Sequence, residues 1–230
     1  MMSAAAALAS DPPHRREHLS VLADVEKRVL FWLAKRLPAW VTSDGLTALG
    51  AVAMAATGLA FAAAPVAPWA VLLVPAFLAV NWFGDSLDGT LARVRNRQRP
   101  NYGYYLDHVV DLANATMLFV GMAFSGLCSP AIATALLIGY LLLCAESFLA
   151  THSLGVFRIS FGGVGPTELR ILLSIGAVVA FTRPMVTPFG IAQVKLFDLG
   201  GLIGAAGMGV VFVLSAIRNA RALSKAEPHR

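Results

Sequence analysis

Charged residues are scarce in this chain. Only 13% of its 230 residues are Asp, Glu, Lys or Arg, whereas 57% are hydrophobic, and the mean hydropathy is +0.70. A soluble globular domain carries about 25% charged residues, so the composition excludes an ordinary soluble protein. The alternation of polar and apolar residues that marks a membrane β-barrel is also missing. Because lipid tolerates only helices and closed barrels, the sequence predicts an all-α integral membrane protein.

Cysteine is rare as well, and the two cysteines form no known motif. The two cysteines, Cys128 and Cys144, lie in apolar surroundings, which favours packing residues over a disulfide or a metal pair. The N-terminus lacks the shape of a signal peptide, because the short apolar start MMSAAAALAS is followed at once by the polar DPPHRRE. The net charge of +5 comes from Lys and Arg at helix ends, so we expect no nucleic-acid partner.

Apolar runs and the breakers between them predict six membrane-spanning helices. Their expected ranges are 44–63, 69–94, 103–127, 130–151, 167–183 and 197–217. We divide the chain into an N-terminal segment, 1–40, a six-helix transmembrane domain, 41–220, and a cytoplasmic tail, 221–230.

The N-terminal segment itself contains a helical pattern. Its apolar residues recur at helical spacing among basic ones, at Leu22, Val25, Val29, Leu33 and Leu37. This pattern predicts an amphipathic helix that lies on the membrane surface. A helix that caps the bundle is the alternative, and the two are compatible.

Lys and Arg are distributed unevenly between the two sides of the predicted membrane domain. If the N-terminus is cytoplasmic, Arg183 and Lys195 fall outside and the other sixteen of the 18 basic residues fall inside. Cytoplasmic segments of membrane proteins carry the excess of positive charge. The sequence therefore predicts that both termini and the Arg-rich loop around residues 93–99 face the cytoplasm, in the inner or plasma membrane if the source is bacterial.

Four aspartates lie within the second and third predicted spans. Asp85 and Asp88 share one face of the second span, and Asp107 and Asp111 share one face of the third. An acid in a spanning helix costs about 2.5–3.5 kcal/mol, so four without neutralisation would cost on the order of 10–14 kcal/mol. Two divalent cations would balance four carboxylates, and all-oxygen ligands favour Mg²⁺ or Mn²⁺ over zinc. A buried acid network with protonated members and an ion or proton pathway are the alternatives.

The spacing of these residues also carries a family resemblance. The stretch FGDSLDGTLARVRNRQRPNYGYYLDHVVD fits the pattern D-x2-D-G-x2-A-R-x9-G-x3-D-x3-D, which resembles the signature of the CDP-alcohol phosphotransferase family. Its positions are Asp85, Asp88, Gly89, Ala92, Arg93, Gly103, Asp107 and Asp111. Six spans after an amphipathic helix are similar to that family's architecture, which is commonly a homodimer. The segment TSDGLT resembles the family's Pro-Asn-x-x-Thr stretch, with Ser43 and Asp44 in place of Pro and Asn.

The resemblance implies roles for the motif residues. Asp85, Asp88 and Asp107 would bind two Mg²⁺ or Mn²⁺ ions per active site, with Asp111 as a further ligand and as the base that takes the proton of the attacking hydroxyl. The nucleotide of a CDP-linked donor would lie against Asp88, Gly89, Ala92, Arg93, Gly103, Asp107 and Thr47. Paired metal ions stabilise both the attacking and the leaving oxygen of a phosphoryl displacement. The implied enzyme transfers a substituted phosphoryl group to a hydroxyl acceptor and releases CMP.

Fewer residues indicate where the acceptor would bind. The candidates for an acceptor pocket are Thr167, Glu168, Arg170 and Arg158. Thr167 and Glu168 equally suit an ordinary helix start after Pro166, and the two arginines equally suit the cytoplasmic boundary of the bundle.

Three functions are compatible with these observations. We expect CDP-diacylglycerol as donor, a small polar alcohol as acceptor and membrane lipids as surroundings. The reverse arrangement, in which a soluble CDP-alcohol passes phosphocholine or phosphoethanolamine to diacylglycerol, is the first alternative. An ion or proton transporter is the alternative from a different class.

Overall fold

The computed structural model describes residues 15–17, 23–154, 156–158 and 165–227. The helix α2 (Ala23–Ala34) precedes six longer helices, which are α3 (Ser43–Ala63), α4 (Val74–Val94), α5 (Pro100–Phe124), α6 (Pro130–Leu154), α7 (Pro166–Thr182) and α8 (Leu196–Ala226). Two 3₁₀ turns, η1 (Pro68–Leu73) and η2 (Pro188–Gly190), join them. Two short strand pairs were not predicted: β1 (Arg15–Glu17) runs parallel to β2 (Val156–Arg158), and β3 (Met185–Val186) antiparallel to β4 (Val194–Lys195).

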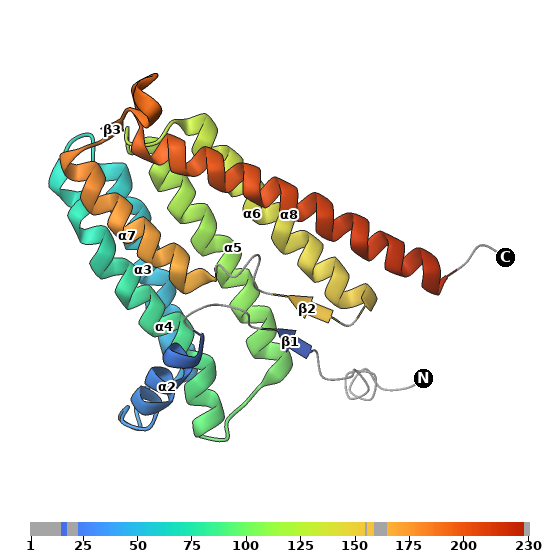
Figure 1. Ribbon diagram of the computed structural model, residues 1–230. Helices are drawn as coiled ribbons and strands as arrows, with labels where there is room; N and C mark the ends of the chain where they lie inside the picture. The colour runs from blue at the N-terminus through green and yellow to red at the C-terminus, as the bar shows by residue number, and fades with distance from the viewer. Residues whose placement is uncertain (1–14, 18–22, 155, 159–164, 228–230) are drawn as a thin grey trace.

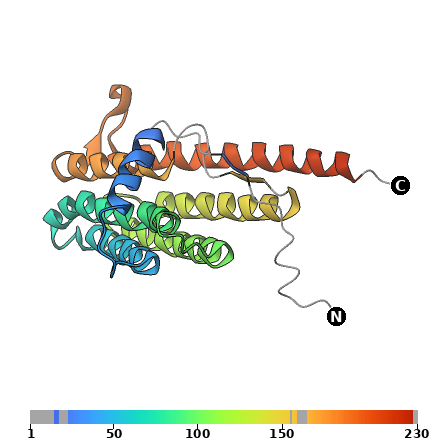
Figure 2. The same ribbon diagram turned by 90° about the horizontal axis from the view of Figure 1, so that it is seen from below.

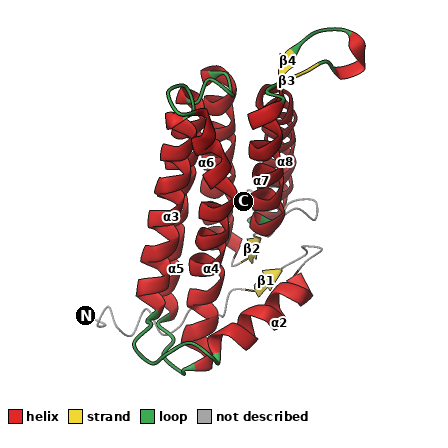
Figure 3. Ribbon diagram, turned by 90° about the vertical axis from the view of Figure 1, so that its left-hand side faces the viewer, coloured by secondary structure: helices red, strands yellow, loops and turns green. Residues whose placement is uncertain are grey.

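The six longer helices form an up-and-down bundle. Figure 1 shows α5 between α3 and α6, with α8 running along α6. In Figure 2, α7 and α8 lie in one row at one side of the other helices. In Figure 3, α2 is inclined across one end of the bundle, and β3 and β4 lie at the opposite end. The all-helical architecture predicted from composition is therefore confirmed, with two small strand pairs added at its ends.

Each predicted span overlaps one of the six helices, but not all six have the properties of a spanning segment. In the described residues, four segments are long and apolar enough to cross a membrane, namely Ser43–Ala63, Pro68–Val94, Pro130–Leu154 and Leu196–Ala226. Outside this set are α7, which has 17 residues, and α5, whose first half carries Asp107 and Asp111. Crossing by all six helices stays a prediction. The last helix continues to Ala226, into the range that the sequence analysis set apart as a tail.

Glycines bring α3 unusually close to its two neighbours. A Cβ added to Gly84 of α4 would lie 2.5 Å from the backbone oxygen of Leu46, and one added to Gly121 of α5 would lie 2.1 Å from that of Gly58. Helices in a membrane associate by such close contacts, since lipid supplies no hydrophobic drive between them. The two helices that carry the aspartates are thus both packed against α3.

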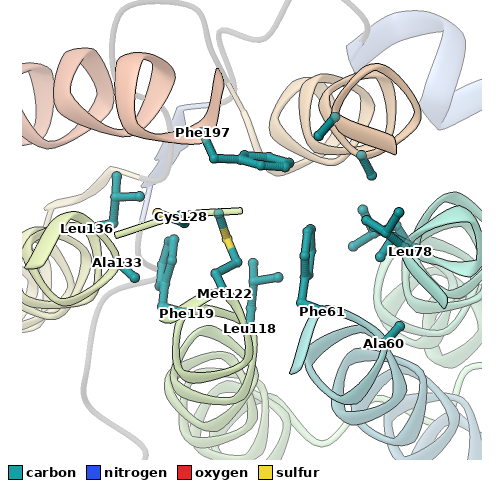
Figure 4. Packing of buried hydrophobic residues seen from close by; sticks show 14 of the residues in the cluster. Ala60, Phe61, Leu78, Leu118, Phe119, Met122, Cys128, Ala133, Leu136 and Phe197 are labelled. Carbon is teal, nitrogen blue, oxygen red and sulfur yellow. The ribbon is translucent and has the colours of Figure 1, made fainter. Parts of the chain in front are cut away.

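Two apolar clusters lie on either side of the aspartates. The larger cluster joins the six longer helices, and Figure 4 shows Phe61, Leu78, Met122, Leu136 and Phe197 among its members. The smaller cluster consists of Leu30, Ala34, Leu46, Leu87 and Leu91, at the end of the bundle where α2 lies. Along α4, Asp85 comes between the last residue of the larger cluster and the first of the smaller one. Asp85 therefore lies between the two apolar clusters.

The helix α2 packs on the bundle with only part of the face that its periodicity indicated, since Leu33 packs against the smaller cluster. Leu30 and Ala34 are buried, whereas Val25 and Val29 are exposed together with Trp32. The capping alternative is therefore what the contacts show, and the exposed apolar side chains leave a surface role open as a prediction. Both cysteines are free thiols, as expected for packing residues.

Candidate functional site

Three of the four aspartates converge. Carboxylate oxygens of Asp85 on α4 and of Asp107 and Asp111 on α5 all lie within 4.8 Å of one another. Two ligands on opposite sides of one Mg²⁺ ion are about 4.2 Å apart, given metal–oxygen distances of 2.0–2.1 Å. The three carboxylates therefore fit a single hard divalent cation after a small adjustment, and oxygen-only ligands are what such a cation prefers.

Asp88 lies beside this group and is held by α3. Thr47 donates its hydroxyl to Asp88 Oδ2 at 2.5 Å, and the backbone N–H of Gly89 donates to Oδ1. Ser43 donates to the backbone oxygen of Asp88 at 2.7 Å. Each carboxylate oxygen has a second lone pair, so these contacts orient Asp88 without preventing it from binding a ligand. The structure thus brings together Thr47 and Asp88, both of which the resemblance assigns to the nucleotide site.

Arg170 lies in the aspartate site and not at the bundle boundary. Its guanidinium forms an ion pair with Asp85, and its Nε donates to Asn81 Oδ1 at 2.8 Å. Asn81 in turn donates to the backbone oxygen of Gly50 at 2.9 Å and is fully buried. Sequence reasoning missed Asn81, although a lone amide within an apolar span was the signal that could have found it. Buried charges persist where they are paired and hydrogen-bonded, and here Arg170 has both kinds of contact.

The other acceptor candidates have structural contacts. The Thr167 hydroxyl donates to Glu26 Oε1 at 2.9 Å, and Glu168 accepts the backbone N–H of Gly165 at 2.9 Å. Pro166 occupies the first turn of α7, so Glu168 serves the helix start that the alternative interpretation described. Arg158 ends β2, but its side chain lies outside the part of the chain that the structure describes.

A cavity lies beside the motif at the end of α4. Its volume is about 410 Å³, and it is lined by Val41, Thr42, Ser43, Asp44, Leu91, Ala92, Arg95, Arg97, Gln98 and Arg99. Arg93 is exposed and donates to Thr90 Oγ1 at 3.0 Å. A Cβ at Gly103 would meet nothing within 4 Å, and one at Gly89 would lie 3.7 Å from Arg93. Among the motif residues expected around the nucleotide, Ala92 thus borders the cavity, whose lining includes Arg95, Arg97 and Arg99.

The Arg-rich loop between α4 and α5 is tied to the linker before α3. Arg95 donates to the backbone oxygens of Leu37 at 3.0 Å and Pro38 at 2.8 Å, and also to that of Val41. Arg99 forms an ion pair with Asp44. Asp44, which stands in place of the family's Asn, therefore lines the cavity and holds Arg99 beside it.

Residues 37–214 match the family of CDP-alcohol phosphatidyltransferases. The chain belongs to this family. A comparison with curated proteins finds no match. Among solved structures, this chain is similar in fold to the phosphatidylinositol phosphate synthase of Mycobacterium tuberculosis, whose crystal structure has CDP-DAG bound. The TM-score is 0.51 and the identity 23%, over 85% of this chain and 92% of that chain. The family resemblance of the motif is confirmed, and it supports a role in phospholipid synthesis.

Proposed function

We propose that this protein transfers a phosphatidyl group from CDP-diacylglycerol to a small polar alcohol and releases CMP. The observation that carries the proposal is the convergence of Asp85, Asp107 and Asp111 beside Arg170. Family membership favours this activity over an ion or proton pathway, since such a pathway needs neither the motif glycines nor the motif arginine. The bound donor of the solved neighbour is consistent with CDP-diacylglycerol as the substrate.

The proposed step is a displacement at phosphorus. The acceptor oxygen forms a bond to the phosphorus that carries diacylglycerol, and the bond from that phosphorus to the oxygen bridging to CMP breaks. CMP leaves with the electron pair, and the proton of the acceptor hydroxyl passes to Asp111. Asp111 suits this role because it lies one turn beyond Asp107, deeper in the bundle. General bases typically contribute about 10²–10⁴-fold in rate.

The carboxylates would hold the cofactor. We assign Asp85, Asp88 and Asp107, with Asp111 as a further ligand, to two Mg²⁺ or Mn²⁺ ions. When bound, such ions would stabilise negative charge on the pyrophosphate oxygens. The hydrogen bonds from Thr47 and Gly89 orient Asp88 for this task.

The donor and acceptor would approach from different helices. The cavity next to Ala92, with the open space at Gly103 and the exposed Arg93, suits the cytidine and its phosphates. Arg170 of α7, which forms an ion pair with Asp85, would offer a positive charge to an acceptor. Among the acceptor-pocket candidates, Arg170 is the one that the geometry favours, because Thr167 and Glu168 contact α2 and the start of α7.

The membrane setting belongs to the proposal as well. The charge asymmetry supports six spans with a cytoplasmic active site, and the exposed Trp32 and Val29 suit contact of α2 with lipid. A homodimer is proposed from the family resemblance alone. The orientation predicts that a cysteine placed at Asn101, in a protein lacking its two native cysteines, reacts with an impermeant maleimide only from the cytoplasmic side. Labelling from the outside of intact cells would contradict it.

A transfer assay tests the proposed function. Purified protein in phospholipid nanodiscs receives radiolabelled CDP-diacylglycerol, Mg²⁺ and one acceptor at a time, from a panel of glycerol 3-phosphate, inositol phosphate, serine and choline. The expected result is one labelled lipid product and an equal amount of CMP. Product formed only from CDP-choline or CDP-ethanolamine with diacylglycerol would establish the reverse arrangement. No turnover, together with no thermal stabilisation by CDP and Mg²⁺, would contradict the enzyme assignment.

A further inference from the structure

Glu26 of α2 joins the two helices that flank the aspartate site. Its Oε1 accepts the indole N–H of Trp82 at 2.7 Å and the Ser86 hydroxyl at 3.2 Å, both on α4. The same oxygen accepts the Thr167 hydroxyl of α7 at 2.9 Å. Neither the motif nor the proposed chemistry uses this carboxylate. An acid that gathers three neutral donors from two other helices links those helices.

Two of the three partners of Glu26 lie next to residues of the site. Ser86 directly follows Asp85 on α4, and Thr167 precedes Arg170 by nearly one turn on α7. The ion pair between Asp85 and Arg170 therefore connects the same two helices that Glu26 connects. A movement of the start of α7 away from α4 would lengthen both links together.

The first half of α7 depends on such polar contacts. In α7, which the structure describes throughout its length, the buried residues are Ala177 and Ala180, both in the second half. Thr167 and Arg170 anchor the first half through Glu26, Asn81 and Asp85. The helices α4 and α5, in contrast, are packed against α3 through glycine contacts that do not involve α7.

We propose that Glu26 is a positioning residue of the transfer reaction, which holds the start of α7 against α4 and so keeps Arg170 at the aspartate site. The inference rests on the proposed transferase function. It assigns to α2 a part in the active site in addition to its packing on the bundle. Loss of the link should displace Arg170 and the acceptor that Arg170 faces, while the aspartates, held by α3, stay in place.

The test compares Glu26→Ala with Glu26→Gln, whose amide oxygen still accepts hydrogen bonds. Asp198→Ala is the matched control, because Asp198 of α8 also binds a distant part of the chain, by accepting the backbone N–H of Ser129, the residue before α6, at 2.6 Å and its hydroxyl at 2.5 Å. That contact lies at the end of the bundle opposite to α2. For each protein, kcat and the acceptor KM are measured with the panel acceptor that supports turnover. The shift in melting temperature on adding CDP with Mg²⁺ is measured alongside.

Glu26→Ala is expected to raise the acceptor KM about tenfold, with a smaller change in kcat and a retained CDP-dependent melting shift. Glu26→Gln should stay within about threefold of the wild type, since an acceptor oxygen remains. Thr167→Val should reproduce much of the effect of Glu26→Ala. The variant that carries both Glu26→Ala and Thr167→Val should be no worse than the more impaired single variant, because both changes break the same contact between α2 and α7.

Three results would overturn the inference. The first is an acceptor KM of Glu26→Ala equal to that of Asp198→Ala. The second is an acceptor KM of Glu26→Gln as high as that of Glu26→Ala. The third is a double variant in which the fold-increases in acceptor KM of Glu26→Ala and Thr167→Val multiply. If the wild-type protein turns over, any of these results contradicts the positioning role of Glu26 and leaves the proposed function standing. Absence of product from the wild-type protein with every acceptor would instead contradict the proposed function and the inference built on it.

Discussion

Acids inside this bundle occur in two different settings. Glu146 of α6 accepts the Ser215 hydroxyl at 3.0 Å and the Asn219 amide at 2.6 Å, both from α8, and Asp198 is bound by Ser129 in a similar way. In the other setting, carboxylates of Asp85, Asp107 and Asp111 lie within 4.8 Å of one another. The first kind of acid joins two helices through neutral donors, whereas the second kind gathers like charges in one place.

The difference separates packing from chemistry. A carboxylate that receives well-placed hydrogen bonds stabilises its surroundings by itself. Carboxylates gathered in one place repel one another, and the ion pair between Arg170 and Asp85 offsets one of their charges. Such a group is retained where a ligand neutralises it, and ionisable groups clustered in this way are typical of functional sites. The comparison predicts that metal, nucleotide and mutation affect transfer through the second kind of acid and have little effect on it through the first.

The largest expected effect is that of metal removal. Exhaustive treatment with EDTA should abolish transfer, and Mg²⁺ or Mn²⁺ should restore it, because three converging carboxylates offer the oxygen ligands that such a cation prefers. Initial rates of CMP release measure the effect, with a Ca²⁺-loaded sample as control for nonspecific ion binding. Full turnover in the chelated protein would show that the cluster is a packing feature after all.

Substitution within the cluster should give the next largest effect. Asp111→Asn keeps nearly the same shape but cannot accept a proton, so the transfer rate should fall by about 10²–10⁴-fold. Three carboxylates remain for metal, so the rise in melting temperature on adding CDP with Mg²⁺ should be retained in part. Asp85→Asn and Asp88→Asn should lose that rise as well as turnover.

The paired measurement distinguishes the roles of these acids. Wild-type turnover in Asp111→Asn would exclude it as the base. If Asp85→Asn kept the full melting shift while Asp111→Asn lost it, the metal ligand and the base would have been assigned the wrong way round. Glu146→Gln serves as the control from the other class of acid, because its contacts to α8 involve neither α4 nor α5.

The parts of this site that the sequence predicted are those with local spacing. Helical periodicity alone places Asp107 and Asp111 on one face, and the motif assigns Asp85 and Asp88 to the neighbouring helix. The contacts of Arg170 and Glu26 could not be predicted in this way. They join residues 85 and 141 positions apart in the sequence, through helix packing that no local pattern specifies. The exposed Val25 and Val29 show the same limit, since periodicity finds an apolar face but not the partner that covers it.

A smaller effect, on stability and not on catalysis, is expected at the opposite end of the bundle. Asp198→Ala removes the acceptor of the Ser129 backbone N–H and hydroxyl. The loss should cost about 1–2 kcal/mol and lower the apparent melting temperature by about 4 °C. The kcat and the shift caused by CDP with Mg²⁺ should stay within about twofold of the wild type, as for independent sites. Thermal melts and transfer assays on the same preparation measure both. A loss of turnover without a loss of stability would show that Asp198 belongs to the functional acids.

The smallest effect is expected at Asp44, which stands where the family has Asn. Its ion pair with Arg99 is about half exposed on both sides, with side-chain exposures of 49% and 54%, and exposed pairs contribute little to stability. Asp44→Asn should therefore change the melting temperature by less than about 1 °C and the CDP concentration for half-maximal stabilisation by less than about threefold.

Thr47→Val, three residues further along the same stretch, is the matched contrast. It removes the hydroxyl that binds Asp88 at 2.5 Å, and an unsatisfied partner in a partly buried site is costly. This variant should weaken stabilisation by CDP with Mg²⁺ by at least about tenfold in concentration. Titrations of both variants, read as melting temperature, separate the two residues. If Asp44→Asn weakened CDP binding as strongly as Thr47→Val, Arg99, which forms the ion pair with Asp44, would belong to the nucleotide site. Asp44 would then count among the functional acids and not among those that only stabilise the packing.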